Sequence, residues 1–294
     1  MPDPMRSHTP DDRIGARDLT AWPTRSGRRL VALAAGLARR SRPAARSVVS
    51  WSSAHLAFVV FAAVALVVLV LLVEGTETVY EGVVGRDGIT AVDQPVLDAA
   101  VSWRSPGLDA AVTAFTDVGG PVGMPVLVAV AVAVITWRRR RWTPVVLMLI
   151  AAAGSLAMTV VGKDFVDRAR PPAALAVPPL EVSPSFPSGH TLNATVLTTV
   201  VVYLVLIETT AAWQRTLTIT LGALFVLSMG LSRVFLGHHW LTDVLAGWLI
   251  GLAWAVAVLT AHRLWLTLRE RPTPADPADP AETARPLPRT DLPS

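Results

Sequence analysis

Apolar runs recur along the central part of the chain, and short polar stretches separate them. Six of these runs are long enough, or nearly so, to cross a bilayer, which takes about 20 helical residues. They cover residues 56–73, 120–137, 143–161, 191–207, 213–231 and 244–262. The pattern predicts an all-α polytopic membrane protein in which six transmembrane helices form a bundle.

The polar segments divide the chain into three parts. Residues 1–54 contain ten arginines among Pro, Ser and Asp, which predicts a flexible Arg-rich cytoplasmic tail rather than a signal peptide. Residues 55–262 form the six-span domain, and residues 263–294 form a Pro-rich tail that we expect to be disordered. Residues 74–119, between the first two spans, carry short helical patterns that predict a small cap or interfacial helices.

Composition supports the membrane class and removes several kinds of chemistry. The chain is 52% hydrophobic and has a mean hydropathy of +0.49, which is high for a soluble domain. It contains no cysteine, so disulfides, thiolate nucleophiles and cysteine-ligated metals are excluded. The sequence pI is about 10.5, but the arginines lie mostly in the tails and in one short loop beside apolar runs. That placement is typical of cytoplasmic loops rather than of a nucleic-acid-binding face.

The arginine distribution predicts the orientation in the membrane. Arginines are frequent in the N-terminal tail, between the second and third spans (Arg138 to Arg141), and after the sixth span. The loop between the first two spans has only Arg86 and Arg104. We therefore expect both termini to be cytoplasmic. A voltage sensor would need arginines spaced along a span, which the run from Arg138 to Arg141 does not provide.

This topology places three unusually polar stretches on one extracytoplasmic face. They are residues 163–171 (KDFVDRARP), 186–191 (FPSGHT) and 232–243 (SRVFLGHHWLTD), and they supply the cations Lys163, Arg168, Arg170 and Arg233. Arginine suits phosphate oxygens, lysine offers a point charge, and the Ser188–Gly189 turn presents N–H groups at a helix start. Together these features predict an anion pocket. Lys163 is the chain's only lysine, and an alternative role as a snorkelling anchor stays open.

The histidines of these stretches are the candidate reactive groups. His239 and Asp243 are four residues apart, which would place them on one face of a helix, and a carboxylate fixes the tautomer of a bonded imidazole. His238 would point about 100° away, so we expect it to pack behind the site. His190 comes from another segment and can protonate a leaving oxygen.

Other functions explain the same residues less well. A metal site made of His190, His239 and Asp243 would suffer repulsion from the nearby cations. A serine hydrolase using Ser188 would lack the G-x-S-x-G elbow. A six-span transporter fits the hydropathy, but the polar residues cluster at one face and no span carries a charge near its middle.

The spacing of the polar residues resembles the three-part signature of the type 2 phosphatidic acid phosphatase family. That family includes undecaprenyl-diphosphate phosphatases and is related to vanadium haloperoxidases. The matching motifs are Lys163-x6-Arg170-Pro171, then Pro187-Ser188-Gly189-His190, then Ser232-Arg233-x5-His239-x3-Asp243. All signature positions are present, and the six-span layout covers roughly residues 55–262.

The resemblance implies a role for each motif residue. His239 would attack phosphorus to form a phosphohistidine, Asp243 would hold it, and His190 would protonate the leaving group and then activate water. The phosphate-binding residues would be Lys163, Arg170, Ser188, Gly189 and Arg233. No metal or other cofactor is expected, because fixed cations take its role.

The implied protein is an integral membrane lipid phosphatase that acts on a lipid phosphate or diphosphate, of the prenyl diphosphate or phosphatidate type. The resemblance favours a prenyl diphosphate, because short members of the family with an outward-facing site often recycle that carrier. A lipid-linked phosphotransferase of the same fold is the alternative, and an amphiphilic substrate suits the six spans better than haloperoxidase chemistry does. The expected partners are the membrane and the lipid substrate, without nucleic acid, and the oligomeric state stays open.

Overall fold

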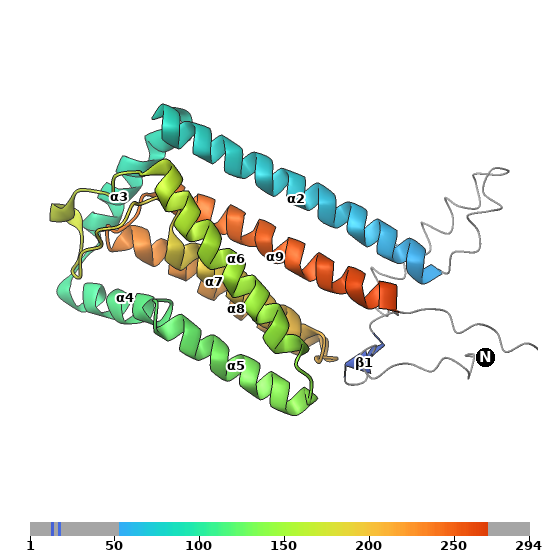
Figure 1. Cartoon of the computed structure of the whole chain (residues 1–294). Helices are drawn as coiled ribbons and strands as arrows, with labels where there is room; N and C mark the ends of the chain where they lie inside the picture. Colours follow the sequence, from blue (N-terminus) through green and yellow to red (C-terminus); the bar gives the residue numbers. More distant parts are fainter. Residues whose placement is uncertain (1–12, 15–16, 19–52, 270–294) are drawn as a thin grey trace, which may run out of the picture.

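A computed structural model describes residues 13–14, 17–18 and 53–269 of the chain (Figure 1). Most of both predicted tails therefore lies outside the described residues. The helices are α2 (Ser53–Gly85), α3 (Asp93–Ser102), α4 (Pro106–Val118), α5 (Gly123–Arg139), α6 (Thr143–Val166), α7 (Gly189–Leu206), α8 (Ala212–Phe235) and α9 (Leu241–Arg269). Two 3₁₀ turns, η2 (Gly88–Val92) and η3 (Ala173–Leu175), and two short antiparallel strands, β1 (Arg13–Ile14) and β2 (Arg17–Asp18), complete the elements.

The helical membrane architecture predicted from the sequence is confirmed. Five described helices are long and apolar enough to cross a bilayer, namely α2, α6, α7, α8 and α9. The predicted second span corresponds instead to a bent pair, α4 and α5, whose axes differ by 49°. Counting that pair as one span gives six among the described residues.

The first span is longer than the apolar run predicted. Helix α2 continues past residue 73 to Gly85, so residues 74–85 are part of that helix rather than of a cap. The extension is stabilised by Val79 and Val83, which are four residues apart and pack on Phe186 and Ala246. Of the later residues of the loop, η2 and α3 lie at the end of the bundle, whereas α4 leads into α5 (Figure 1).

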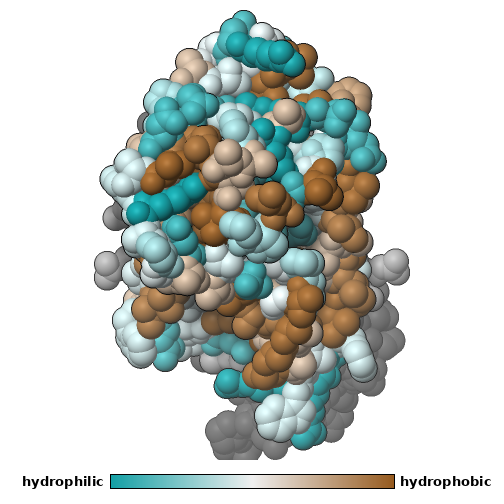
Figure 2. Space-filling model, turned by 90° about the vertical axis from the view of Figure 1, so that its left-hand side faces the viewer, coloured by the Kyte–Doolittle hydropathy of each residue, from teal (hydrophilic) through white to brown (hydrophobic). Residues whose placement is uncertain are grey.

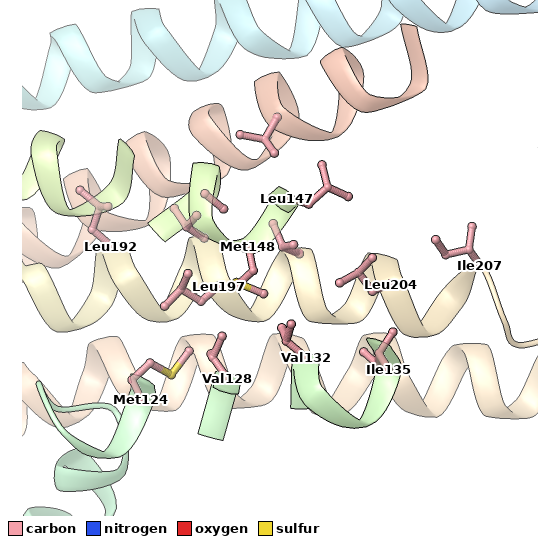
Figure 3. Close-up of a cluster of buried hydrophobic side chains, with 14 of the residues drawn as sticks. Met124, Val128, Val132, Ile135, Leu147, Met148, Leu192, Leu197, Leu204 and Ile207 are labelled. Atoms are coloured by element: carbon pink, nitrogen blue, oxygen red, sulfur yellow. The ribbon is translucent and has the colours of Figure 1, made fainter. Parts of the chain in front are cut away.

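Helix α7 is the centre of the bundle and packs against α5, α6, α8 and α9. The main hydrophobic cluster forms around it, with Met124, Val128, Val132 and Ile135 from α5, Leu147 and Met148 from α6, and Leu192, Leu197 and Leu204 from α7 (Figure 3). Helix α2 contacts mainly α9 and leaves large apolar side chains such as Leu66 and Leu71 exposed. Exposed leucines on a span are expected where the surroundings are lipid.

Two glycines of α9 allow it to approach α7 closely. A Cβ at Gly247 would lie 2.9 Å from a threonine Cβ of α7, and a Cβ at Gly251 would lie 2.8 Å from another. Small residues four apart are a common means of bringing transmembrane helices together. This close approach also brings the starts of α7 and α9 together, and there the N–H of Ser188 donates to the carbonyl of Asp243 at 3.1 Å.

The segment between α6 and α7 folds over this same end of the bundle. Within it, the N–H of Ser185 donates to the carbonyl of Arg168 at 2.8 Å, and the N–H of Val177 donates to Leu236 at 2.9 Å. Viewed from this end, the surface mixes hydrophilic and hydrophobic residues (Figure 2). The three polar stretches predicted to share a face therefore do meet.

Candidate active site

His239 and Asp243 are in contact, but not in the way that the sequence predicted. Helix α9 begins only at Leu241, so His239 lies in the turn before it and the two residues do not share a helix. Nevertheless Nδ1 of His239 is 3.4 Å from Oδ2 of Asp243. The contact forms because the carboxylate folds back over the helix start, where Oδ2 also accepts the N–H of Trp240 at 2.9 Å.

The carboxylate of Asp243 is completely buried and is held by several donors. Ser185 Oγ donates to Oδ2, and Nη1 of Arg168 donates to Oδ1 at 2.5 Å. Arg168 is itself held by Asp93, the first residue of α3, through an ion pair of 2.7 Å. Asp93 also accepts the N–H of Thr242 at 2.9 Å. The orientation of Asp243 thus depends on three segments that are distant in sequence.

The surroundings of His239 determine which of its two ring nitrogens carries the proton. Nε2 lies 3.2 Å from Nη1 of Arg170, and a guanidinium can only donate. Nε2 must therefore accept, so the proton is on Nδ1, which faces Asp243. Burial lowers the pKa of His239 to about 4; Asp243 acts in the opposite direction, and the nearby arginines add to the lowering. The ring is neutral at pH 7, with an unprotonated Nε2.

A carboxylate occupies the space in front of that nitrogen. Glu181 forms an ion pair with Arg170 at 2.7 Å and another with Arg233, and its Oε2 lies 4.0 Å from Nε2 of His239. Burial by itself would favour the neutral acid, but the two arginines lower the pKa of Glu181 to about 2. Arg233 is almost fully buried, and its Nη1 donates to Thr116 of α4 at 3.0 Å. The site therefore already holds one anion, supplied by the chain itself.

Lys163 lies in the last turn of α6 and points into the same region. Its Nζ donates to Ser183 Oγ at 3.0 Å and to the carbonyl of Pro184. A groove of about 630 Å³ begins here and runs between α5, α6 and α7. Its polar lining includes Lys163, Glu181, His190 and His239, and its apolar lining includes Met124, Leu156 and Leu197. This shape fits an amphiphile with an anionic head.

The remaining predicted residues are placed as follows. His190 and Gly189 begin α7 and line the groove, where Gly120 lies beside Nε2 of His190. Ser188 is fully buried, and its hydroxyl accepts from Thr191 at 2.9 Å rather than lining the groove. Its predicted contact with phosphate stays a prediction.

His238, in contrast, lies behind the site. Its Nε2 is 2.7 Å from the carbonyl of Val177 and must carry the proton, because a carbonyl can only accept. This bond ties the turn before α9 to the segment that folds over the site.

Three residues of the site were missed from the sequence: Glu181, Arg168 and Asp93. Glu181 is the only acidic residue between Arg168 and Ser188, and that isolation was a usable signal. Arg168 was grouped with the cations of its stretch but was given no role. Asp93 is distant in sequence from the polar stretches and showed no such signal.

Comparison with known proteins finds a matching family model, a similar protein and similar solved structures. A family model described as the PAP2 superfamily matches residues 141–266. Phosphatidylglycerophosphatase B of Bacillus subtilis (strain 168) is 32% identical over 168 residues, which are 56% of this chain and 81% of that protein. The crystal structure of a transmembrane PAP2-type phosphatidylglycerolphosphate phosphatase from Bacillus subtilis aligns with a TM-score of 0.60 and 25% identity, over 68% of this chain and 96% of that one.

A crystal structure of Aquifex aeolicus LpxE aligns less closely, with a TM-score of 0.45 and 23% identity, over 57% of this chain and 94% of that one. All three sequence motifs lie within the residues that the family model matches, whereas Asp93 and Thr116 lie outside them.

Proposed function

Because the chain belongs to the PAP2 superfamily and is a membrane lipid phosphatase, we propose that it hydrolyses a lipid phosphomonoester through a phosphohistidine on His239. The observation that carries the proposal is the position of the Glu181 carboxylate. An anion between Arg170 and Arg233, 4.0 Å from Nε2 of His239, marks where a phosphoryl group would sit. Nε2 of His239 faces phosphorus once the N–H of Arg170 that it accepts in this structure turns to a phosphoryl oxygen.

Each step has a residue in position. As Nε2 of His239 attacks, the P–N bond forms and the P–O bond to the lipid breaks. Asp243 stabilises the positive charge that develops on the ring. With the phosphoryl anion bound beside it, His190 becomes protonated, gives this proton to the departing lipid alkoxide, and later removes a proton from the water that cleaves the phosphohistidine. Lys163, Arg170 and Arg233 stabilise the charge on the phosphoryl oxygens, so no metal is required.

A trapping experiment tests the intermediate. In the variant His190→Ala, p-nitrophenyl phosphate should still phosphorylate the protein, because its leaving group needs no proton, whereas loss of the phosphoryl group to water should be slow. We expect a phosphoprotein that survives alkali and is lost in acid, formed with chelator present. The double variant that adds His239→Ala is the control and should stay unlabelled. Labelling that persists in this control would overturn the proposal.

The substrate class follows from the relatives rather than from the motifs. The family resemblance favoured a prenyl diphosphate, but the matched relatives are named for phosphatidylglycerol phosphate. We therefore place a glycerophospholipid monoester first. Initial rates on phosphatidylglycerol phosphate, phosphatidate and undecaprenyl diphosphate in the same detergent test this order. If phosphate were released fastest from undecaprenyl diphosphate, the proposed order of substrates would be reversed.

The side of the membrane is a further part of the proposal. The arginines between α5 and α6 favour a cytoplasmic location for that turn, which puts the candidate site on the extracytoplasmic side. A reporter inserted after Arg141 should give a cytoplasmic signal, and one near Asp87 an extracytoplasmic signal. A cytoplasmic signal at Asp87 would place the site inside the cell.

A further inference from the structure

A second large groove lies at the opposite end of the bundle from the candidate active site. Its volume is about 910 Å³, and it runs between α6 and α9, near the right-hand end of the bundle in Figure 1. Val146, Leu147 and Ile150 of α6 line one wall, and Ala257, Val258 and Ala261 of α9 line the other. Trp254 lines its inner part, where the indole packs on Gly154 and donates to the carbonyl of Ala151 at 3.0 Å.

The rim of this groove is basic and aromatic. The four consecutive arginines point to different places. Arg139 donates to Glu208 and to the carbonyl of Leu204, away from the groove. Arg140 and Arg141 line the groove. Arg140 adopts a left-handed backbone conformation (φ 52°), which a residue other than glycine seldom adopts without some cost. That turn presents its side chain at the groove.

Two tryptophans accompany the arginines at the rim. Trp142 and Trp265 line the groove, and their side chains are 75% and 40% exposed. Tryptophan is enriched where the lipid headgroups meet the hydrocarbon core. Helix α6 extends about 30 Å from this rim to Lys163, at 1.5 Å per residue, so the two grooves lie at opposite sides of a bilayer.

One buried polar group also belongs to this groove. His262 is 7% exposed, and its Nδ1 is 2.9 Å from the hydroxyl of Tyr203. Its Nε2 has no hydrogen-bond partner in the part of the chain that the structure describes, although the residue lines the groove. A buried polar atom without a partner is costly unless a ligand or water satisfies it.

We propose that this groove binds one anionic phospholipid of the bilayer. The headgroup phosphate pairs with Arg140 and Arg141, because a guanidinium matches phosphate oxygens with two parallel hydrogen bonds. An acyl chain lies along the apolar walls of α6 and α9, and a glycerol ester oxygen reaches Nε2 of His262. The site is separate from the candidate active site and does not depend on the proposed reaction.

Matched variants within the same segments provide the test. Arg140→Gln together with Arg141→Gln removes the headgroup contacts, and Arg138→Gln is the control, because Arg138 is exposed and does not line the groove. Ile150→Trp fills the groove, and Leu149→Trp adds the same bulk on an outward-facing position that does not line it. Each control alters the same helix or loop, so general effects on insertion should be shared.

The measurement is lipid retention by native mass spectrometry of the full chain in detergent. The probe is dioleoylphosphatidylserine, a phosphodiester that a phosphomonoesterase does not cleave, compared with dioleoylphosphatidylcholine. We expect the wild type and both controls to retain one phosphatidylserine in preference to phosphatidylcholine. The apparent Kd should rise about tenfold in the arginine pair and in Ile150→Trp, which corresponds to about 1.4 kcal/mol.

Two results would overturn the proposal. Equal retention of the two lipids by the wild type would mean only non-specific lipid around the helices. Equal phosphatidylserine binding by the groove variants and their controls would mean that the lipid binds elsewhere, or that this groove is filled by the chain itself or by a second copy.

Discussion

Oε2 of Glu181 lies 4.0 Å from Nε2 of His239, the ring nitrogen that Asp243 leaves free. With its pKa lowered to about 2, Glu181 is ionised at neutral pH and cannot supply the proton that a leaving alkoxide needs. Its position is instead the one that we propose for the phosphoryl group of the substrate. Glu181 must therefore leave the arginines before a substrate can bind there.

Removal of this internal competitor should help substrate binding. We expect Glu181→Gln to lower KM for a lipid phosphate about two- to fivefold with kcat little changed, because partly exposed ion pairs contribute about 0.5–1 kcal/mol. Steady-state kinetics in mixed micelles gives both constants. Glu208→Gln is the control, since Glu208 also pairs with an arginine but at the other end of the bundle. A large fall in kcat would instead assign Glu181 to the reaction itself.

The two adjacent histidines should differ sharply. His239→Ala removes the proposed nucleophile and should abolish turnover. His238→Ala removes the bond to Val177 and a 3.9 Å approach to Glu181, and should leave much of the turnover. The measurement is the rate of phosphate release by each variant, made on protein that elutes as a single species on gel filtration. Equal loss in the two variants would show that His238 is also part of the reacting centre.

The acid limit of activity should reflect the lowered pKa of His239. A histidine with an ordinary pKa would lose its free Nε2 below about pH 6.5, but burial lowers the pKa of His239 to about 4. The ring should therefore stay neutral, and competent as a nucleophile, until the pH falls through about 4. NMR titration of isotope-labelled histidine, assigned with His239→Ala, measures this directly and avoids the ionisation of the substrate. A midpoint near 6.5 would contradict it.

The sequence predicted the helices and the motif residues because hydropathy and spacing are local properties. The six apolar runs follow from hydropathy. The number of membrane crossings between the polar segments then predicts that Lys163, His190 and His239 meet at one end of the bundle. The bend between α4 and α5 was missed, because the sequence began the second span at residue 120 and assigned the helical pattern of α4 to the preceding loop, so the two were not read as one bent span. Asp93 was missed for another reason: its partner Arg168 is brought to it only by the packing of the whole bundle.

That long-range contact leads to a test of positioning. Asp93→Asn and Arg168→Gln should each lower kcat about tenfold, because each loosens a buried charged hydrogen bond to the group that orients Asp243. The double variant should be little worse than either single one, with a coupling of about 1.4 kcal/mol, which is the size of one tenfold loss. Asp98→Asn, an exposed change on the same helix, is the control. Additive losses would mean that Asp93 does not act through Arg168.

The last test concerns the single lysine of the chain. If Lys163 were only an anchor at the end of α6, arginine should serve equally well, as it does at every other basic position. Its ammonium, however, donates to Ser183 Oγ and to the carbonyl of Pro184, and Lys163 lines the same groove as Glu181, whose carboxylate lies where we propose the phosphoryl group. The broader guanidinium should misplace its positive charge relative to the negative charge that develops on the phosphoryl oxygens.

Lys163→Arg should therefore insert normally yet lose about 10²–10³ in kcat, equivalent to about 2–4 kcal/mol, with a smaller change in KM. The exposed change Arg138→Lys, measured in parallel, should leave both constants unchanged. A near-normal kcat in Lys163→Arg would assign the lysine to anchoring alone.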